Sequence, residues 1–523
     1  MNNLFKRIPW FYILLTIFPL LFLWVKNVSE IYASDVIRPF VFTLAGSGIL
    51  YAILYAIFRN TWKAALIGSL LLLAFFSYGQ LYYEARVTPA LRLFSHHSIL
   101  MPIYAIILGI GIWVLSFRLK KYDGVSRYLN WVSLALVIIQ AAQLGYATIG
   151  AYSRARQPLE LQGGMSIKAD TKDLPDVYFI VLDGYMRADA MKQDLGFDNT
   201  AFIHELEEMG FYVARCSRPN YDVTRAAIAS TLNMSYISNM PDVSTVEVSS
   251  FYNIIKNNQV RHQLESAGYR TVAFETDFPW LNFDNADIYF NRNHSVTDFG
   301  ELYPFEVTYM NSTALSALNA AVSKLGIRSI LAARQSGRNT GESNLPLLNS
   351  LQHHANVQLF ILDKLLQVPQ IPGPKFVYAH LIVPHYPYVF GPDGEILTDP
   401  GFTAGGGSTA INADYARRGY LDGIQFINGR IVPILQAILH ESKIPPIIVL
   451  EGDHGQSNEN KYTSLNAYYL PKGYQNLYET ITPVNSFRII LDEYLGGNYP
   501  VLADHTHIND VATVPETYAD CMP

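Results

Sequence analysis

The chain has 523 residues, of which 50% are hydrophobic and 16% are charged. This length predicts two or three domains. The charged fraction lies below the usual value of about 25%, which excludes a disordered chain. Two cysteines are too few for a disulfide-rich scaffold.

Charge divides the chain into two regions. Residues 1–150 contain 12 lysines and arginines against 4 aspartates and glutamates, a net charge of +8. Because the whole chain carries −6, residues 151–523 carry −14. A nucleic-acid binder needs basic charge on a soluble surface, and here the soluble region is the acidic one. We therefore expect no nucleic-acid partner.

Five apolar runs in the basic region fit a helix that spans a bilayer, which needs about 20 residues. Tryptophan and tyrosine residues lie near their ends, as is typical of membrane interfaces. We predict a five-helix transmembrane domain over residues 1–150, although a cleaved signal peptide is an alternative for the first run alone. The predicted spans are Trp10–Val25, Phe40–Phe58, Ala64–Tyr82, Ile99–Phe117 and Leu129–Ile149.

The orientation follows from lysine and arginine in the short connections. With a cytoplasmic N-terminus, the inner segments hold eight of these residues and the outer ones four, which agrees with the positive-inside rule. Five spans then place the chain after residue 150 on the extracytoplasmic side of the cell membrane. Cys216 and Cys521 can pair in that oxidising space, and two unpaired cysteines are the alternative.

Residues 151–175 predict a linker, because they contain Gln157-Pro158, Gly163-Gly164 and scattered charges. Over residues 176–523, short apolar strands alternate with helical patterns. This alternation predicts an α/β domain with a mainly parallel sheet and helices on both faces. The predicted strands are Asp176–Leu182, Phe211–Arg215, Thr271–Phe274, Phe376–Ile382 and Ile447–Leu450, and the predicted helices include Asn199–Met209, Val260–Ser266 and Asn412–His440.

Polar residues follow three of the predicted strands, and in such sheets function lies at the carboxyl ends of the strands. Asp183 follows the first strand, His385 follows the fourth, and Asp453-His454 follow the last between two glycines. Aspartate and histidine from separate strand ends can converge as metal ligands. An ordinary Asp-Gly turn is the alternative for Asp183.

The segment Asn220–Arg225 (NYDVTR) precedes an alanine-rich helical stretch, and Thr224 lies at its start. A hydroxyl at this position caps the helix or acts as a nucleophile, since a helix N-terminus stabilises an anion. A threonine nucleophile needs a metal or a base to activate it. Because the carboxylates and His454 can hold such a metal, we interpret Thr224 as the nucleophile.

These residues resemble the alkaline phosphatase and sulfatase superfamily over about residues 175–500. The resemblance rests on VLDGY at 181–185, NYDVTR at 220–225, the segment His380–Pro387 and GDHG at 452–455. With its membrane spans, the chain is similar to the group of lipoteichoic acid synthases and phosphoethanolamine transferases. The sulfatase signature Cys-x-Pro-x-Arg is absent from the sequence, which argues against hydrolysis through formylglycine.

The resemblance implies a role for each motif residue. Asp183, Asp453 and His454 would bind one metal ion together with Thr224, which would also be the nucleophile. His385 would contact the phosphate or protonate the leaving group. Three oxygen ligands and one imidazole favour zinc or manganese over calcium or magnesium.

Arg225 and Arg187 are weaker candidates for binding the anion as bidentate partners, with a solvated surface arginine as the alternative. The predicted activity is a membrane-anchored, metal-dependent transfer of a phospho-alcohol group, of phosphoglycerol or phosphoethanolamine type. The donor is a membrane lipid, the acceptor an envelope glycan or lipid, and the intermediate a phosphothreonine. The alternatives are a sulfatase-like or phosphodiesterase hydrolase of the same fold and an inactive receptor or scaffold.

Other histidines are not predicted to be ligands. The dense group Asp504–His507 is expected to form a solvated loop, and His353-His354 and His96-His97 are expected at a surface or interface. His380 lies within an apolar strand, which predicts a hydrogen-bonded core residue.

Overall fold

The protein divides into two compact units in a computed structural model. The model describes residues 8–28, 31–119, 122–154, 174–240, 248–292, 302–318, 346–397, 413–456, 462–508, 512–513 and 521. The first unit, called the membrane unit, groups Met1–Gly150 with His294–Ser350. The second, called the α/β unit, groups Ala151–Asn293 with Leu351–Pro523. Most of the predicted linker 151–175 lies outside the described residues, so its limits stay a prediction.

The membrane unit contains four helices that are long and apolar enough to cross a bilayer, namely Ala33–Phe58, Thr61–Arg86, His97–Arg118 and Gly124–Thr148. They make the chain a multi-pass membrane protein. The helix that precedes them is apolar but has only 17 residues, so the fifth span stays a prediction. The helices of the membrane unit are α1 (Trp10–Lys26), α2 (Ile37–Phe58), α3 (Thr61–Val87), α4 (His97–Trp113), α5 (Asp123–Arg154) and α11 (Pro304–Ser312).

Helix α11 belongs to this unit although it lies far along the chain. Phe305 is fully buried in an apolar cluster with Leu23, Ile31 and Val36. Glu306 forms a buried ion pair with Arg38. Gly79 of α3 allows close approach, because a Cβ there would lie 2.3 Å from the Asn311 carbonyl oxygen. The segment therefore packs on the membrane helices.

The α/β unit is built on a seven-stranded sheet with the order β2-β7-β6-β1-β5-β3-β4. The strands β6, β1, β5, β3 and β4 are parallel, while β7 runs antiparallel between β6 and β2. This topology confirms the predicted mainly parallel sheet. The bounds are β1 (Val177–Leu182), β2 (Tyr212–Val213), β3 (Arg270–Phe274), β4 (Ile288–Phe290), β5 (Lys375–Leu381), β6 (Ile447–Glu451) and β7 (Asn466–Tyr469).

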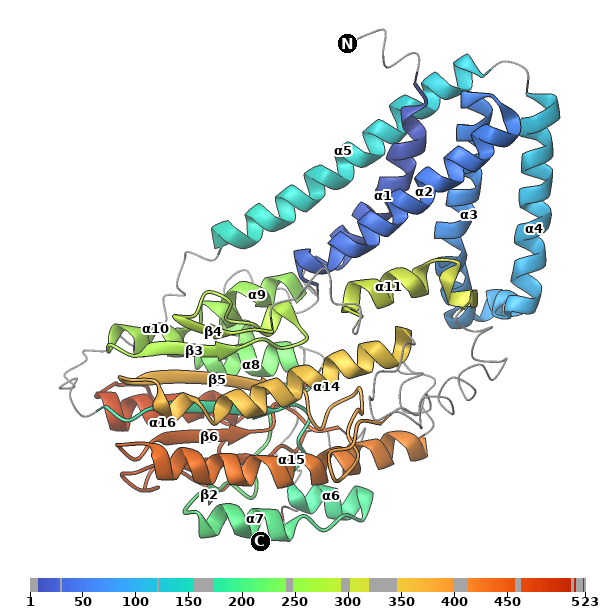
Figure 1. The fold of residues 1–523 in the computed structure, drawn as a ribbon. Helices are drawn as coiled ribbons and strands as arrows, with labels where there is room; N and C mark the ends of the chain where they lie inside the picture. The colour runs from blue at the N-terminus through green and yellow to red at the C-terminus, as the bar shows by residue number, and fades with distance from the viewer. Residues whose placement is uncertain are drawn as a thin grey trace. The chain divides into compact units, whose positions relative to one another are not determined.

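Helices cover both faces of the sheet, with α14 and α15 on one face and α8 and α16 on the other (Figure 1). Alternate residues of β1, Val177, Phe179 and Val181, enter one apolar core with residues of α8 and α16. The central strands are buried along their whole length, as expected for a covered parallel sheet. The helices are α6 (Ala188–Leu195), α7 (Thr200–Glu208), α8 (Thr224–Asn233), α9 (Val248–Lys256), α10 (Gln259–Ser266), α14 (Pro346–Leu365), α15 (Ala413–Glu441) and α16 (Pro483–Leu495), and a small ribbon pairs β8 (His507–Ile508) with β9 (Ala512–Thr513).

Candidate metal centre beside a threonine

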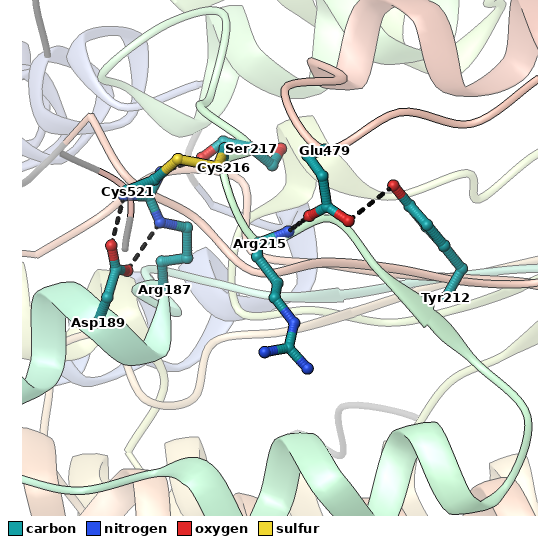
Figure 2. The surroundings of a disulfide bond; sticks show 8 residues. All are labelled: Arg187, Asp189, Tyr212, Arg215, Cys216, Ser217, Glu479 and Cys521. Carbon is teal, nitrogen blue, oxygen red and sulfur yellow. Dashed lines mark hydrogen bonds and ion pairs between the residues drawn. A yellow bond between two sulfur atoms is a disulfide. The ribbon is translucent and has the colours of Figure 1, made fainter. Parts of the chain in front are cut away.

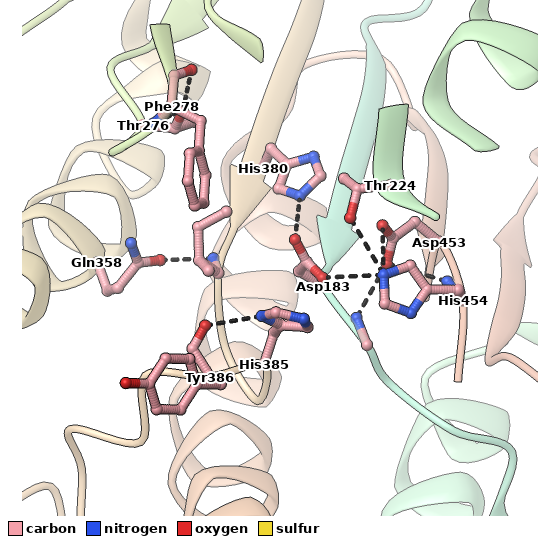
Figure 3. A network of polar contacts seen from close by, with 12 residues as sticks. Asp183, Thr224, Thr276, Phe278, Gln358, His380, His385, Tyr386, Asp453 and His454 are labelled. Atoms are coloured by element: carbon pink, nitrogen blue, oxygen red, sulfur yellow. Dashed lines mark hydrogen bonds and ion pairs between the residues drawn. The ribbon is translucent and has the colours of Figure 1, made fainter. Parts of the chain in front are cut away.

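Three neighbouring central strands present the polar residues singled out in the sequence. Asp183 follows β1, His385 follows β5, and Asp453-His454 follow β6. Because β6, β1 and β5 are adjacent and parallel, their carboxyl ends lie at the same edge of the sheet. Figure 3 shows these side chains pointing toward one another.

Asp453 is held by one of its two carboxylate oxygens. Its Oδ1 accepts backbone N–H bonds from Gly184 at 2.9 Å and from His454 at 3.0 Å. Its Oδ2 is buried and has no hydrogen-bond partner. Gly452 makes this turn possible, because a Cβ there would lie 2.2 Å from the Tyr185 carbonyl oxygen.

Asp183 is arranged in the same way. His380 Nε2 donates to its Oδ2 at 3.2 Å, and Tyr378 donates its hydroxyl to His380 Nδ1 at 3.1 Å. The other oxygen, Oδ1, is buried without a hydrogen-bond partner. Each aspartate is therefore fixed through one oxygen and offers the other to the space between them.

His454 occupies the centre of this arrangement. Its Nδ1 donates to the Gly455 carbonyl at 2.8 Å, which turns Nε2 toward the site. That nitrogen lies 3.1 Å from Thr224 Oγ1, 3.5 Å from Asp183 Oδ1 and 3.5 Å from Asp453 Oδ2 (Figure 3). The structure thus brings together the four residues that the sequence analysis grouped as ligands.

These atoms fit a divalent cation. Two ligands of a tetrahedral zinc ion are about 3.3 Å apart, given metal–ligand distances of about 2.0–2.1 Å, and the spacings around His454 Nε2 match this value. The two buried carboxylate oxygens without hydrogen-bond partners are the groups that a cation would satisfy. His385 and His380 each lie close enough to Asp183 to join such a cluster.

The pKa values show an excess of buried negative charge. Burial alone would raise the pKa of Asp183, but His385, His380 and His454 outweigh it and hold that pKa below its usual value. Burial and the charge of Asp183 raise the pKa of Asp453. Burial would lower the pKa of His454, yet the two carboxylates outweigh it and raise that pKa. A cation at this position would relieve the repulsion between the aspartates.

Thr224 is the first residue of α8 and does not cap it. The cap residue is Val223, which makes no side-chain cap bond, and the Thr224 hydroxyl faces His454 instead. The capping alternative is therefore not what the structure shows. Arg225 follows Thr224, and its guanidinium lies over the Phe251 ring, 5.9 Å from the ring centre.

His385 borders the site on the β5 side. Its Nδ1 donates to the Tyr386 carbonyl at 2.7 Å, so its Nε2 is available to a substrate group. The ring centre lies 5.7 Å from that of His454 in an edge-on arrangement. This placement is compatible with the predicted role of His385 as proton donor, which stays a prediction.

Arg187 is placed differently from the prediction. Its guanidinium binds both carboxylate oxygens of Asp189 at 2.7 Å and donates to the Ser217 carbonyl at 3.0 Å. These partners occupy most of its N–H groups in a structural contact. The role of Arg187 or Arg225 in binding an anion stays a prediction.

Three histidines outside the predicted ligand set contact buried carboxylates. His380 is a hydrogen-bonded core residue, as predicted, but its partner is a site carboxylate. The register of β5 against β1, which pairs His380 with Val181, is the signal that reveals this contact. The expectation of a surface position for His353 and His354 is wrong, because both are buried against Asp277.

The comparisons with known proteins give similarity in fold. No protein-family model and no curated protein matches the chain. The integral membrane lipooligosaccharide phosphoethanolamine transferase A of Neisseria meningitidis is 12% identical, with a TM-score of 0.39 over 92% of this chain and 95% of that one. The zinc complex of the periplasmic domain of Escherichia coli EptC is 11% identical, with a TM-score of 0.40 over 66% of this chain and 87% of that domain.

A phosphonate monoester hydrolase from Silicibacter pomeroyi is also similar, with 15% identity and a TM-score of 0.37 over 62% of this chain and 74% of that one. The resemblance inferred from the sequence motifs is thus accompanied by similarity to solved phosphoethanolamine transferases and a phosphonate hydrolase.

Proposed function

We propose that the protein is a membrane-anchored transferase that moves a phospho-alcohol group from a membrane lipid to an envelope glycan or lipid. One observation carries the proposal. The Thr224 hydroxyl, at the N-terminus of α8, lies 3.1 Å from a histidine nitrogen that also faces an open oxygen of Asp183 and of Asp453. A hydroxyl needs such neighbours to act as a nucleophile at neutral pH.

Thr224, Asp183, Asp453 and His454 would hold the divalent ion, with zinc or manganese preferred for this mixture of oxygen and imidazole. When bound, the ion lowers the pKa of a coordinated hydroxyl and neutralises negative charge on a transferring group. The backbone N–H groups at the start of α8 favour the same anion. Arg225, next along the helix, supplies a positive charge at that end.

The chain's residues support a two-step transfer. In the first step, Thr224 Oγ releases its proton to solvent and forms a bond to phosphorus, and the bond from phosphorus to the lipid oxygen breaks. Protonated His385 gives its proton to the departing lipid alcohol and becomes neutral. In the second step, neutral His385 takes the proton of an acceptor hydroxyl, the acceptor oxygen forms a bond to phosphorus, the bond from phosphorus to Thr224 Oγ breaks, and Thr224 regains a proton from solvent.

The membrane unit and the disulfide support a location at the outer side of the membrane for this reaction. A tethered enzyme meets lipid donors at a high effective concentration. Cys216 and Cys521 pair in a disulfide, which settles the alternatives left by the sequence. Such bonds persist in oxidising compartments, so we place the α/β unit on the extracytoplasmic side.

Labelled lipid tests the proposal directly. The full-length protein is incubated with a lipid carrying a labelled phospho-alcohol headgroup, with and without a glycan acceptor. We expect label on the protein that disappears in Thr224→Val, persists in Thr224→Ser, and passes to the acceptor. Label that appears only in a water-soluble product would favour the hydrolase, and a labelled Thr224→Val variant would overturn the assignment of the nucleophile.

A further inference from the structure

The segment that leads into Thr224 is held by the C-terminal end of the chain. Asn220 is bonded both to α16, through the backbone N–H of Val484 that donates to its Oδ1 at 2.7 Å, and to the segment 503–507, called the C-terminal strap. His507 donates its backbone N–H to the Asn220 carbonyl at 2.8 Å, and the Asn220 side chain donates to the His505 carbonyl at 2.9 Å. These bonds continue a parallel bridge between Tyr221 and His507.

Side chains reinforce this contact. The His507 ring stacks on the Tyr221 ring, with centres 5.0 Å apart and planes 15° from parallel. The buried Thr506 hydroxyl donates to the Pro219 carbonyl at 2.9 Å. The strap is therefore an ordered part of the α/β unit, and the expectation of a solvated loop at Asp504–His507 is wrong.

The strap is itself fixed at several points. Asp504 Oδ1 accepts bonds from the Thr482 backbone N–H at 3.0 Å, the Thr482 hydroxyl at 2.8 Å and the Asn485 amide at 3.0 Å. The Tyr236 hydroxyl donates to the Ala503 carbonyl at 2.5 Å. Because these partners belong to the packed core, the strap transmits a fixed position to the residues it touches.

A covalent bond closes the same region. The disulfide joins Cys216, four residues before Asn220, to Cys521 at the end of the chain, with the two Cα atoms 5.3 Å apart. Figure 2 shows this bond beside the Arg187–Asp189 ion pair, and Arg187 also donates to the carbonyl of Ser217. The segment before Thr224 is thus restrained at both of its ends.

We infer that the C-terminal strap is a positioning element for the nucleophile, with His507 and Thr506 as its positioning residues. Thr224 is only three positions after Tyr221, so a shift of Tyr221 moves the start of α8 relative to His454. A displacement of about 1 Å at a reacting group can cost about 100-fold in rate. The inference rests on the proposed function, because it concerns the position of the same hydroxyl.

Four variants of the full-length protein test this inference in a single-turnover assay with labelled lipid. His507→Ala removes the stacked ring, His507→Phe keeps a ring of similar shape, and Thr506→Val removes one hydrogen bond with little change in size. His505→Ala is the matched control, because His505 is exposed and its backbone groups make the hydrogen bonds, while its ring, among the described residues, meets the Tyr236 ring at 6.0 Å between centres rather than Tyr221 or Pro219.

We expect His507→Ala and Thr506→Val to lower the single-turnover rate constant by about tenfold or more, while the lipid concentration that gives half of the maximal rate and the metal content stay unchanged. His507→Phe and His505→Ala should keep most of the wild-type rate. A wild-type rate in His507→Ala, or a His507→Phe variant as slow as His507→Ala, would overturn the inference. If His507→Ala does not fold, a wild-type rate in Thr506→Val overturns it as well.

Thr224→Val in the same assay separates this failure from a failure of the proposed function. Labelled protein in Thr224→Val means that the proposed function has failed, whatever the strap variants do. No label in Thr224→Val together with a wild-type rate in His507→Ala means that only the positioning role has failed.

Discussion

Arg38 and Glu306 in the membrane unit, and Asp183 and Asp453 in the α/β unit, are all buried charged side chains, but their surroundings differ. Arg38 and Glu306 have opposite charges and pair with each other at 2.5 Å. Asp183 and Asp453 have the same charge, and each keeps a buried oxygen without a hydrogen-bond partner. The first pair is neutralised by its own two members, whereas the second would be balanced by the cation of the proposed function.

The two buried pairs indicate different roles in the molecule. A buried ion pair that is complete within the protein holds two elements together, as Arg38 of α2 and Glu306 of α11 do. A buried pair of like charges is a cost that folding alone does not explain. Because the pair lies at the carboxyl ends of adjacent parallel strands, next to the Thr224 hydroxyl, we propose it as the site of the chemistry.

The largest effect is expected from removing one charge of the like-charged pair. Asp453→Asn should lower transfer activity by about a thousandfold or more, because several kcal/mol of charge stabilisation is lost. The metal-free variant should be at least as stable as the metal-free wild type, since repulsion with Asp183 is relieved. Activity and thermal unfolding after chelation measure both effects. Asp363→Asn, at an exposed position, is the control, and full activity in Asp453→Asn would contradict the account.

Removing one charge of the opposite pair should act on stability instead. Glu306→Gln leaves Arg38 buried without its anion, which should cost about 3–5 kcal/mol. Tryptophan fluorescence reports this loss, because five of the six tryptophans lie in residues 1–150. The exposed Glu84→Gln serves as the control. An unchanged unfolding transition in Glu306→Gln would show that the pair does not hold α11 in place.

His380, which bonds to Asp183, provides a test with a smaller expected effect on the site. His380→Leu removes the donor that fixes Asp183 Oδ2 while Asp183 itself remains. We expect metal affinity to fall by about 10- to 100-fold, as is typical when a residue that orients a ligand is lost. Titration of metal into chelated protein gives this value, with the exposed His204→Leu as control. Equal affinities in the two variants would remove His380 from the site.

Asp277 provides the smallest expected effect and adds one more buried carboxylate to the comparison. Burial would raise its pKa, but His354 and His353 outweigh it, so the pKa lies below its usual value of 3.8. A carboxyl group with a lowered pKa in the folded state stabilises the protein above pH 3.8, and this contribution is lost as the pH falls through the folded-state pKa. Denaturant unfolding from pH 6 down to acid should therefore show a shallower loss of stability in Asp277→Asn. Identical slopes in both proteins would contradict this assignment.

The sequence predicts the central sheet because its strands are apolar and buried on both faces. Val177–Leu182 and Ile447–Glu451 match the predicted runs closely. The strand Asn466–Tyr469 was not predicted, since it is short and pairs antiparallel near the edge of the sheet. The predicted strand Phe211–Arg215 shrinks to two residues for the same reason. Short strands carry a weak apolar signal.

The sequence predicts which polar residues follow the strands, but it does not predict which distant residues contact them. Neither spacing nor composition shows that His380 reaches Asp183, that Arg187 is occupied by Asp189, or that Cys216 pairs with Cys521 305 residues away. The membership of α11 in the membrane unit is hidden in the same way, because it depends on an ion pair between positions 38 and 306. Contacts between distant residues are set by tertiary packing rather than by local pattern.

Anomalous diffraction from metal-loaded crystals shows where the ion binds. We expect one peak at the absorption edge of zinc or manganese, with Asp183 Oδ1, Thr224 Oγ1, Asp453 Oδ2 and His454 Nε2 all about 2.0–2.2 Å from it. A peak elsewhere in the α/β unit, or fully loaded protein without a peak among these four atoms, would contradict this expectation.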